Sequence, residues 1–445
     1  MEIFFIRALQ LILALSLLVL VHEFGHFLFA RIFKVRVEKF YLFFDWNFSL
    51  FKWKPKNSHT EYGIGWIPLG GYCKIAGMVD ESMDTEQMKK PAESWEYRSK
   101  PAWQRLLIIV GGVMFNLILA FFIYSMVLFA WGDKYVDLHK IENGFTFNEK
   151  AKEIGFEDGD MIIKMDGEEI HKLYLDKIRS VNLMRQICAA DTVTVLRDGK
   201  EADIAIPEDL GLLDMNKPTL FLTTRFLPVI GDMDSTGVAA LYGMQLNDSI
   251  VSIDGRSIKS WDDIKAAMGY LKEEGKSTFE IMLMRDSLMQ FTVTADTSFV
   301  LGITPIANEY PLERVSYSFF GSFPAGAAFA MDVLKGYVSD FQYVFSSEGA
   351  KSVGMFGSIG SLFPAMWDWN AFWMMTAFLS IVLAFMNILP IPALDGGHAV
   401  FLIYEMITGK QPSENFMIWT QWIGMGILLC LFLLATFNDL MKFVF

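Results

Sequence analysis

Four long apolar runs constrain this 445-residue chain more than any other feature of its sequence. A helix needs about 20 residues to cross roughly 30 Å of hydrocarbon, and each run exceeds that length. The runs are Ile3–Ala30, Leu106–Trp131, Trp369–Leu394 and Phe416–Phe437. Three of them contain no charged residue, and 53% of the whole chain is hydrophobic. The sequence therefore predicts a multi-pass α-helical membrane protein with four transmembrane helices.

Positive charge is concentrated directly after the first run. The segment Arg31–Lys56 contains seven Lys or Arg residues against Glu38 and Asp45. Because cytoplasmic loops are enriched in Lys and Arg, residues 31–105 are predicted to be cytoplasmic and the chain after Trp131 to be outside. Both termini are then outside the cytoplasm. The net charge of −13 and the lack of a clustered basic face give no reason to expect a nucleic-acid partner.

Two histidines and a glutamate interrupt the first run in the segment HEFGH. His22 and His26 are four residues apart, so on a helix they share one face, a spacing at which two imidazoles bind one metal ion. Glu23 is placed to take a proton from water during attack on a carbonyl. Ionisable groups inside a span cost about 2.5–3.5 kcal/mol each, which makes the segment a functional candidate. A purely structural polar patch between helices would need only neutral polar residues.

A catalytic zinc usually has three protein ligands and an open position, so one ligand must come from elsewhere in the chain. The third run ends in NILPIPALDGGHAV, where Pro390 and Pro392 are expected to end the helix at membrane depth. Asp395 is the candidate third ligand, and His398 is the alternative, with Asp395 then as its hydrogen-bond partner. Because the first and third runs both point inward, the metal is expected near the cytoplasmic leaflet.

The polar region between the second and third runs contains an internal repeat. GFEDGDMIIKMDGEEI and GMQLNDSIVSIDGRSI, which begin at Gly155 and Gly243, align without gaps. Each copy predicts a turn, an alternating strand and a tight Asp-Gly turn. A helix-like stretch follows each copy, over residues 172–187 in the first. Two tandem α+β modules are therefore expected, and residues 311–367 are expected to contain a helix lying in the membrane interface.

Residues 61–78, EYGIGWIPLGGYCKIAGM, are predicted to form a β-hairpin. An alternating stretch from Tyr62 to Trp66 leads to the pair Gly70-Gly71, and a return strand follows over Tyr72–Ile75. The free edge of such a hairpin can pair with an unwound substrate. The alternative is a hairpin that only packs against the helices.

Together these motifs resemble the site-2 protease family, and within it the regulator of sigma-E protease type with tandem PDZ domains. The resemblance rests on HEFGH, on N-x-x-P-x-P-x-x-D-G-G, on the tandem repeat, and on residues 61–78, which match the membrane-reentrant β-loop of the family. It implies an intramembrane zinc metalloprotease with one Zn²⁺ per chain. Its substrates would be single-pass membrane proteins, for example anti-sigma factors after a first cleavage, or signal-peptide remnants.

The same resemblance implies roles for individual residues. His22, His26 and Asp395 would be the zinc ligands, and Glu23 the catalytic base. The resemblance also implies that Asn387 contacts the substrate. The unwound end of the third run adds Pro390 and Pro392 as substrate-binding candidates, and the predicted hairpin adds Gly70 and Gly71. For Asn387, a helix-capping or purely structural role is the alternative.

The implied organisation has five parts. They are an N-terminal membrane part over 1–131 with its second span at about 104–131, PDZ-like modules over 138–222 and 223–303, the interfacial segment 311–367, and a C-terminal membrane part over 369–445 with its last span at about 416–438. The implied location is the bacterial cytoplasmic membrane, with the modules outside the cytoplasm.

Three questions stay open at this point. The PDZ-like modules either bind extended peptides at a sheet edge or act as a size-excluding cover. The chain as a whole could be a non-enzymatic membrane adaptor whose histidines no longer bind metal. A metal transporter is a third class, because buried His and Asp also mark ion pathways, but it explains neither Glu23 nor the large inserted modules.

Overall fold

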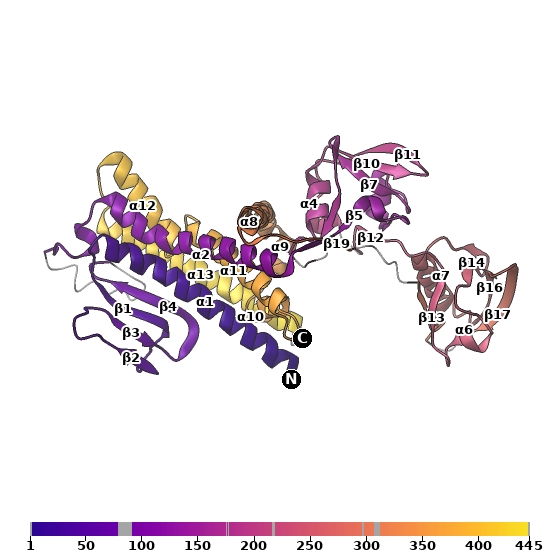
Figure 1. Ribbon diagram of the computed structural model, residues 1–445, viewed down its shortest axis with the longest axis horizontal. Helices are drawn as coiled ribbons and strands as arrows, with labels where there is room; N and C mark the ends of the chain where they lie inside the picture. Colours follow the sequence, from indigo (N-terminus) through magenta and orange to yellow (C-terminus); the bar gives the residue numbers. More distant parts are fainter. Residues whose placement is uncertain are drawn as a thin grey trace. The chain divides into compact units, whose positions relative to one another are not determined.

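The computed structural model describes residues 2–78, 91–174, 176, 178–215, 219–295, 298–306 and 312–443 (Figure 1). The chain divides into two compact units. The helical unit comprises Met1–Asp133 and Val315–Phe445, and the inserted unit comprises Lys134–Arg314. Each unit is described by itself.

Four helices among the described residues are long and apolar enough to cross a membrane. They are α1 (Glu2–Ile32), α2 (Ala102–Trp131), α11 (Trp369–Ile388) and α13 (Glu414–Phe443). Helix α2 packs against both α1 and α11, so it forms the centre of the helical unit (Figure 1). The prediction of four long apolar helices is confirmed.

The third predicted span is shorter than its apolar run, as its prolines indicated. Helix α11 ends at Ile388, and Leu389 is extended with φ −60° and ψ 143°. The residue before a proline is sterically biased toward this conformation, and Pro390 has no N–H to continue a helix. A new helix, α12 (Asp395–Thr408), begins after the break. Asp395 is therefore the first residue of a helix rather than part of a loop.

A four-stranded sheet in the order β2-β3-β1-β4 lies beside α1 (Figure 1). Its strands are β1 (Val37–Phe44), β2 (Phe51–Trp53), β3 (Glu61–Ile64) and β4 (Ile67–Ile75). Strand β3 pairs with β1 in parallel, and β4 pairs with β1 antiparallel. The predicted hairpin, in which β3 and β4 are neighbours, is therefore wrong, because β1 inserts between the two strands.

The glycine pair expected at the hairpin turn instead lies inside β4. A Cβ atom on Gly70, whose φ is 156°, would lie 2.8 Å from the ring of Phe44. On Gly71 it would lie 2.7 Å from the carbonyl oxygen of Tyr41 and 2.8 Å from the side chain of Val19. The two glycines therefore allow β4 to pass closely between β1 and α1.

The segment predicted to lie in the interface contains three helices, and its first residue, 311, lies outside the described residues. The helices are α8 (Phe319–Phe341), α9 (Ser347–Ser352) and α10 (Phe356–Leu362). Helix α8 packs on α2, where the rings of Tyr124 and Phe329 stack with centroids 4.4 Å apart. Its position in the membrane interface stays a prediction.

The inserted unit contains two modules built around matching four-stranded sheets. The first contains β5 (Asp133–Asp137), β6 (Phe145–Phe147), α3 (Glu149–Ile154), β7 (Met161–Met165), β8 (Glu168–Glu169), β9 (Lys172–Tyr174), α4 (Asn182–Ala189), β10 (Thr192–Arg197), β11 (Lys200–Ala205), α5 (Leu212–Met215) and β12 (Leu222–Thr224). The second contains β13 (Ile230–Met233), α6 (Val238–Leu241), β14 (Ser249–Ile253), β15 (Arg256–Ser257), α7 (Trp261–Glu273), β16 (Thr278–Met284), β17 (Leu288–Thr294) and β18 (Ile303–Pro305), with β19 (Leu312–Val315) after it. The sheet order β11-β10-β7-β8 matches β17-β16-β14-β15 strand for strand. The assignment of these modules as PDZ domains stays a prediction.

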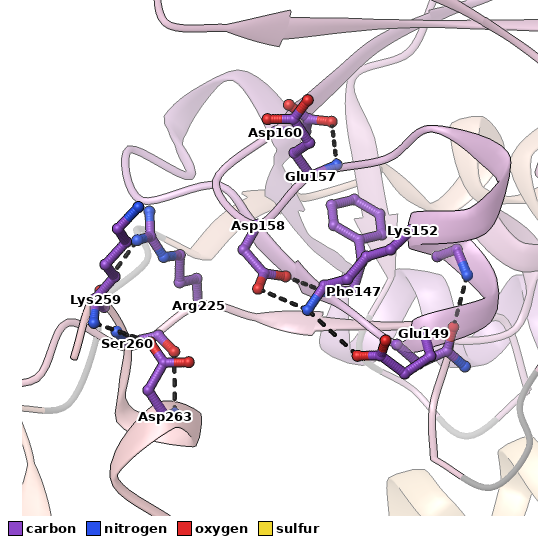
Figure 2. Close-up of polar contacts among 12 residues, drawn as sticks. Phe147, Glu149, Lys152, Glu157, Asp158, Asp160, Arg225, Lys259, Ser260 and Asp263 are labelled. Atoms are coloured by element: carbon purple, nitrogen blue, oxygen red, sulfur yellow. Dashed lines mark hydrogen bonds and ion pairs between the residues drawn. The ribbon is translucent and has the colours of Figure 1, made fainter. Parts of the chain in front are cut away.

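Each module is held by the same buried ion pair. The carboxylate of Asp160 accepts hydrogen bonds from two guanidinium nitrogens of Arg197 at 2.8 and 2.7 Å, and Asp248 accepts the equivalent bonds from Arg285 at 2.6 and 2.7 Å. Each carboxylate also accepts a bond from the backbone N–H three residues earlier, drawn for Asp160 in Figure 2. Burial opposes the charged form of Asp248, but the bonds and charge of Arg285 together with the bond from the N–H of Gln245 outweigh it and hold the pKa of this carboxyl below its usual value.

The tight Asp-Gly turns of the repeat are present in both modules. Asp166 and Gly167 have φ of 48° and 80°, and Asp254 and Gly255 have φ of 49° and 76°. Two consecutive positive φ angles are the signature of a type I′ turn, which fits the twist of a two-stranded ribbon. This part of the sequence prediction is confirmed.

The helix predicted over residues 172–187 is wrong in its first half. Lys172–Tyr174 form strand β9, which pairs with β5, and helix α4 begins only at Asn182. Strand pairing with a distant segment overrides the local helical pattern there. In the second module the corresponding helix α7 forms as expected, and Ser260 and Asp263 make a capping box at its start (Figure 2).

We predict that Asp248→Asn loosens the second module and leaves the first unchanged. The substitution removes the charge that Arg285 pairs with, which costs roughly 2 kcal/mol and raises hydrogen exchange about 30-fold in segments that open globally within the module. Hydrogen-exchange mass spectrometry of the full-length protein measures both modules at once. Asp160→Asn is the matched control, since it should affect only the first module. Equal protection of both modules in both variants would contradict the prediction.

Candidate metal centre

The HEFGH segment lies in the C-terminal half of α1. The helix places His22 and His26 on one face, with their Nε2 atoms 3.2 Å apart. Both residues are 9% exposed. Their rings meet edge to face, with centroids 4.8 Å apart. Two nitrogen atoms in this arrangement can bind the same cation.

Asp395 completes a three-atom group with the two histidines. Its Oδ2 lies 3.2 Å from the Nε2 of His22 and 3.5 Å from that of His26. A tetrahedral zinc with bonds of about 2.0–2.1 Å separates its ligand atoms by about 3.3 Å, so one ion fits the three atoms. The same Oδ2 is buried and has no hydrogen-bond partner of normal geometry. A bound cation would satisfy this oxygen, which would otherwise be costly to bury.

Helix α2 supplies the groups behind the two imidazoles. The Nδ1 of His26 lies 2.8 Å from the carbonyl oxygen of Ile108, so Nδ1 carries the proton and Nε2 keeps its lone pair. Asn116 lies behind His22, with its amide nitrogen 3.2 Å from Nδ1 and its amide oxygen buried without a partner. When the side-chain amide of Asn116 is turned by half a rotation, its oxygen takes the place of its nitrogen. The Nδ1–H of His22 then donates a hydrogen bond to that oxygen. Both Nε2 atoms then face Asp395 as ligand atoms.

Glycines bring α2 close enough to make these contacts. A Cβ on Gly25 would lie 2.3 Å from the carbonyl oxygen of Gly111. A Cβ on Gly112 would lie 2.5 Å from His26 Nε2 and 2.6 Å from the ring of His22. The backbone of α2 therefore forms one wall of the candidate metal centre, and no larger residue fits at Gly112.

A cavity of about 680 Å³ opens onto the group. Its walls include His22, His26, Asp395 and the carboxylate-bearing Glu23, together with residues 71–75 of strand β4. Strand β4 is the edge strand of its sheet, and among the described residues no strand pairs with its outer side. The carboxylate of Glu23, a potential metal centre and an edge strand thus line one cavity. This arrangement suits hydrolysis of an extended peptide.

The family comparison covers nearly the whole chain. A family model described as peptidase family M50 matches residues 10–431. The chain belongs to peptidase family M50.

Relatives in this family match the chain end to end. It is similar to the regulator of sigma E protease of Haemophilus influenzae, at 26% identity over 97% of this chain and 98% of the relative. The regulator of sigma-E protease RseP of Escherichia coli is 27% identical over 96% of this chain and 97% of the relative. A Borreliella burgdorferi protein named as a candidate zinc metalloprotease is 30% identical over 96% and 97% of the two chains. The chain is thus an intramembrane metalloprotease, and the adaptor alternative is not favoured.

The structure places some of the other predicted site residues of this M50 protein beside the candidate metal centre and its cavity, and others outside the cavity lining. The amide nitrogen of Asn387, at the end of α11, lies 3.5 Å from His22 Nε2. Gly71 lines the cavity, whereas Gly70, Pro390 and Pro392 are outside its lining. His398 lines the cavity but is not one of the three residues whose ligand atoms lie within 4.8 Å of one another. The roles of all these residues stay predictions.

Three residues near the site were missed from the sequence. Asn116 and Gly112 belong to the second apolar run, and Gln421, which lines the cavity from α13, belongs to the fourth. Polar residues inside a span are expensive and face a protein interior or cavity, so Asn116 and Gln421 carried a usable signal. Gly112 carried none, because glycine is frequent in membrane helices for packing reasons alone.

We predict that Gly112→Ala weakens metal binding at the candidate metal centre. The new methyl group would overlap His26 Nε2 and the His22 ring, so the imidazoles must move apart. Elemental analysis of the purified protein should show metal content reduced by about tenfold, as expected for displaced ligands. Gly426→Ala is the matched control, because a Cβ there meets nothing within 4 Å. Full metal content in Gly112→Ala would contradict the described packing.

Proposed function

We propose that this chain is a zinc endopeptidase that cuts peptide bonds within transmembrane segments, with one Zn²⁺ held by His22, His26 and Asp395. One observation carries the proposal above all others. A buried carboxylate oxygen without a hydrogen-bond partner faces two imidazole nitrogens at 3.2 and 3.5 Å. Two nitrogens and one carboxylate oxygen form a ligand set typical of catalytic zinc.

Zinc bound there would polarise the scissile carbonyl and lower the pKa of a water molecule to about 7. Glu23 is the general base. It accepts a proton from the attacking water, whose oxygen forms a bond to the carbonyl carbon, and later gives a proton to the leaving amine as the C–N bond breaks. Asn116 and the carbonyl of Ile108 hold the two imidazoles so that their Nε2 atoms stay directed at Asp395.

A transmembrane helix must unwind before it can be cut, because its carbonyl groups are occupied by internal hydrogen bonds. We propose that the unwound segment pairs with the outer edge of β4. The edge lies along the same cavity as Glu23, and pairing would replace the lost helical hydrogen bonds. Asn387, beside His22, would then hold the substrate backbone through its side-chain amide, and Pro390 and Pro392 would keep the chain around it unwound.

The physiological substrates are proposed to be single-pass membrane proteins. Relatives named regulator of sigma-E protease support anti-sigma factors as one class, and signal-peptide remnants are the second. The four apolar helices and the bacterial relatives support a location in the bacterial cytoplasmic membrane. The charge pattern around the first span supports an orientation with the inserted unit and both termini outside and the metal centre toward the cytoplasmic leaflet. The two modules of the inserted unit are proposed to be PDZ-like.

We predict that Glu23→Gln keeps zinc but abolishes cleavage, whereas Asp395→Ala loses both. The side-chain amide introduced by Glu23→Gln cannot accept the proton, while all three zinc ligands are intact, so the rate should fall about 10³-fold or more. Zinc is measured by elemental analysis, and cleavage with a purified single-pass substrate. A fully active Glu23→Gln enzyme would refute the mechanism. Membrane fragments that accumulate in cells carrying Glu23→Gln would identify the natural substrates.

We also predict that Gly71→Val impairs cleavage and leaves the zinc content unchanged. The side chain would overlap Tyr41 and Val19 and shift the β4 edge. Loss of one or two backbone hydrogen bonds to the substrate, at roughly 1 kcal/mol each, lowers kcat/KM about tenfold. Gly426→Ala again serves as the control. An unchanged kcat/KM would remove the β4 edge from the mechanism.

A further inference from the structure

The inserted unit contains a second group of potential metal ligands. Asp137 ends strand β5, His139 lies in the short 3-10 helix Leu138–Lys140, and His171 directly precedes β9. One ligand atom from each of the three residues lies within 4.8 Å of the others. The Nδ1 atoms of the two histidines are 3.1 Å apart, and Asp137 Oδ1 is 3.6 Å from His139 Nδ1.

Backbone pairing holds these residues together. Strand β5 pairs antiparallel with β9, which sets Asp137 opposite Lys172. The N–H of Leu138 donates to the carbonyl oxygen of His171 at 2.9 Å, so the chain next to both histidines is fixed. The carboxylate of Asp137 also accepts a bond from the N–H of His139 at 3.1 Å. The close approach of the side chains thus follows from the sheet and not from flexible loops.

The geometry of this pair repeats that of the HEFGH histidines. The rings of His139 and His171 have centroids 4.7 Å apart and planes inclined at 79°, against 4.8 Å and 83° for His22 and His26. Ligand atoms of a tetrahedral zinc are separated by about 3.3 Å, close to the nitrogen separations of both pairs. Four of the six histidines of the chain form these two pairs, which face each other through Nε2 atoms at His22 and His26 and through Nδ1 atoms at His139 and His171.

A neighbouring carboxylate favours the required orientation of His171. Glu169 Oε2 lies 3.5 Å from the Nε2 of His171, on the side of the ring opposite the Nδ1 that faces His139. A carboxylate on the outer nitrogen of a histidine fixes the tautomer that leaves the inner nitrogen free to bind metal. The position of this carboxylate agrees with the tautomer that the proposed site requires.

We propose that Asp137, His139 and His171 bind a divalent transition metal ion, with Zn²⁺ as the first candidate. Imidazole nitrogens suit Zn²⁺, Cu²⁺ and Ni²⁺, whereas Ca²⁺ and Mg²⁺ prefer oxygen ligands. The histidine side chains are 35% and 52% exposed, so the ion is reached from solvent and keeps an open position. Bound metal cross-links β5 to β9 and stabilises the first module. It takes no part in the cleavage chemistry proposed above.

The test counts zinc in the full-length protein purified in detergent and dialysed against buffered micromolar Zn²⁺. Elemental analysis should give about two ions per chain for the native sequence, and about one for His139→Ala/His171→Ala. His22→Ala/His26→Ala should also give about one, and the quadruple variant close to none. The double variants separate failure of this proposal from failure of the proposed catalytic site. His59→Ala, at an exposed histidine outside both groups, is the control and should keep about two.

A second measurement detects the cross-link itself. Zn²⁺ should slow hydrogen exchange in residues 133–140 and 171–174 of the native protein, and this effect should vanish in His139→Ala/His171→Ala. Glu169→Gln should weaken zinc binding at this site by about tenfold. Equal zinc content in the native protein and in His139→Ala/His171→Ala, or exchange that does not respond to Zn²⁺, would overturn the proposal.

Discussion

The contact of the Asp395 carboxylate with His22 and His26 is the interaction on which the arrangement of the helical unit depends. An ionised group that is shielded from water is tolerated only when opposite charge or a metal compensates it. His22 and His26 lie within 3.5 Å of its Oδ2, and each imidazole is held from behind by α2. Three helices, α1, α2 and α12, must therefore hold a fixed mutual position for the carboxylate to be stable. The helix packing that stabilises the unit therefore also positions the three residues of the candidate metal centre.

Several contacts serve this requirement away from the metal centre. Arg105 of α2 forms an ion pair with Glu405 of α12, and both side chains are largely buried. This pair ties the helix that carries Asp395 to the helix that supports the histidines. Gly396 and Gly397 allow the start of α12 to approach the break after α11, because a Cβ on either would lie 2.5 Å or less from a carbonyl oxygen. Helix α12, which contains Asp395, is thus held in position at both of its ends.

The sequence predicted the parts whose signal is local. Spacing of four residues between His22 and His26, prolines after Ile388, and Asp-Gly at the two ribbon turns each act within a few residues, and the structure contains each feature. Asp395 could be identified from the sequence because it is the first charged residue after an apolar run. The parts that depend on distant partners were not predictable. Strand β1 lies in the charged segment after the first span, and only its pairing with β3 and β4 defines it as a strand. Strand β9 likewise exists because β5 is available to pair with it. The importance of Gly112 depends on which face of α2 meets α1, which no single-sequence pattern gives.

The position of β1 changes what the edge of β4 can do. In the predicted hairpin, β4 would have β3 as its partner and the pair would be a narrow ribbon of marginal stability. With β1 between them, β4 is the edge of a four-stranded sheet and can accept another strand without being displaced. Unpaired backbone groups are not tolerated in hydrocarbon, so an edge at the proposed membrane depth would require water in the cavity or a paired strand. An unwound transmembrane segment has the same requirement, and the proposed pairing with β4 would satisfy both sets of backbone groups beside Glu23.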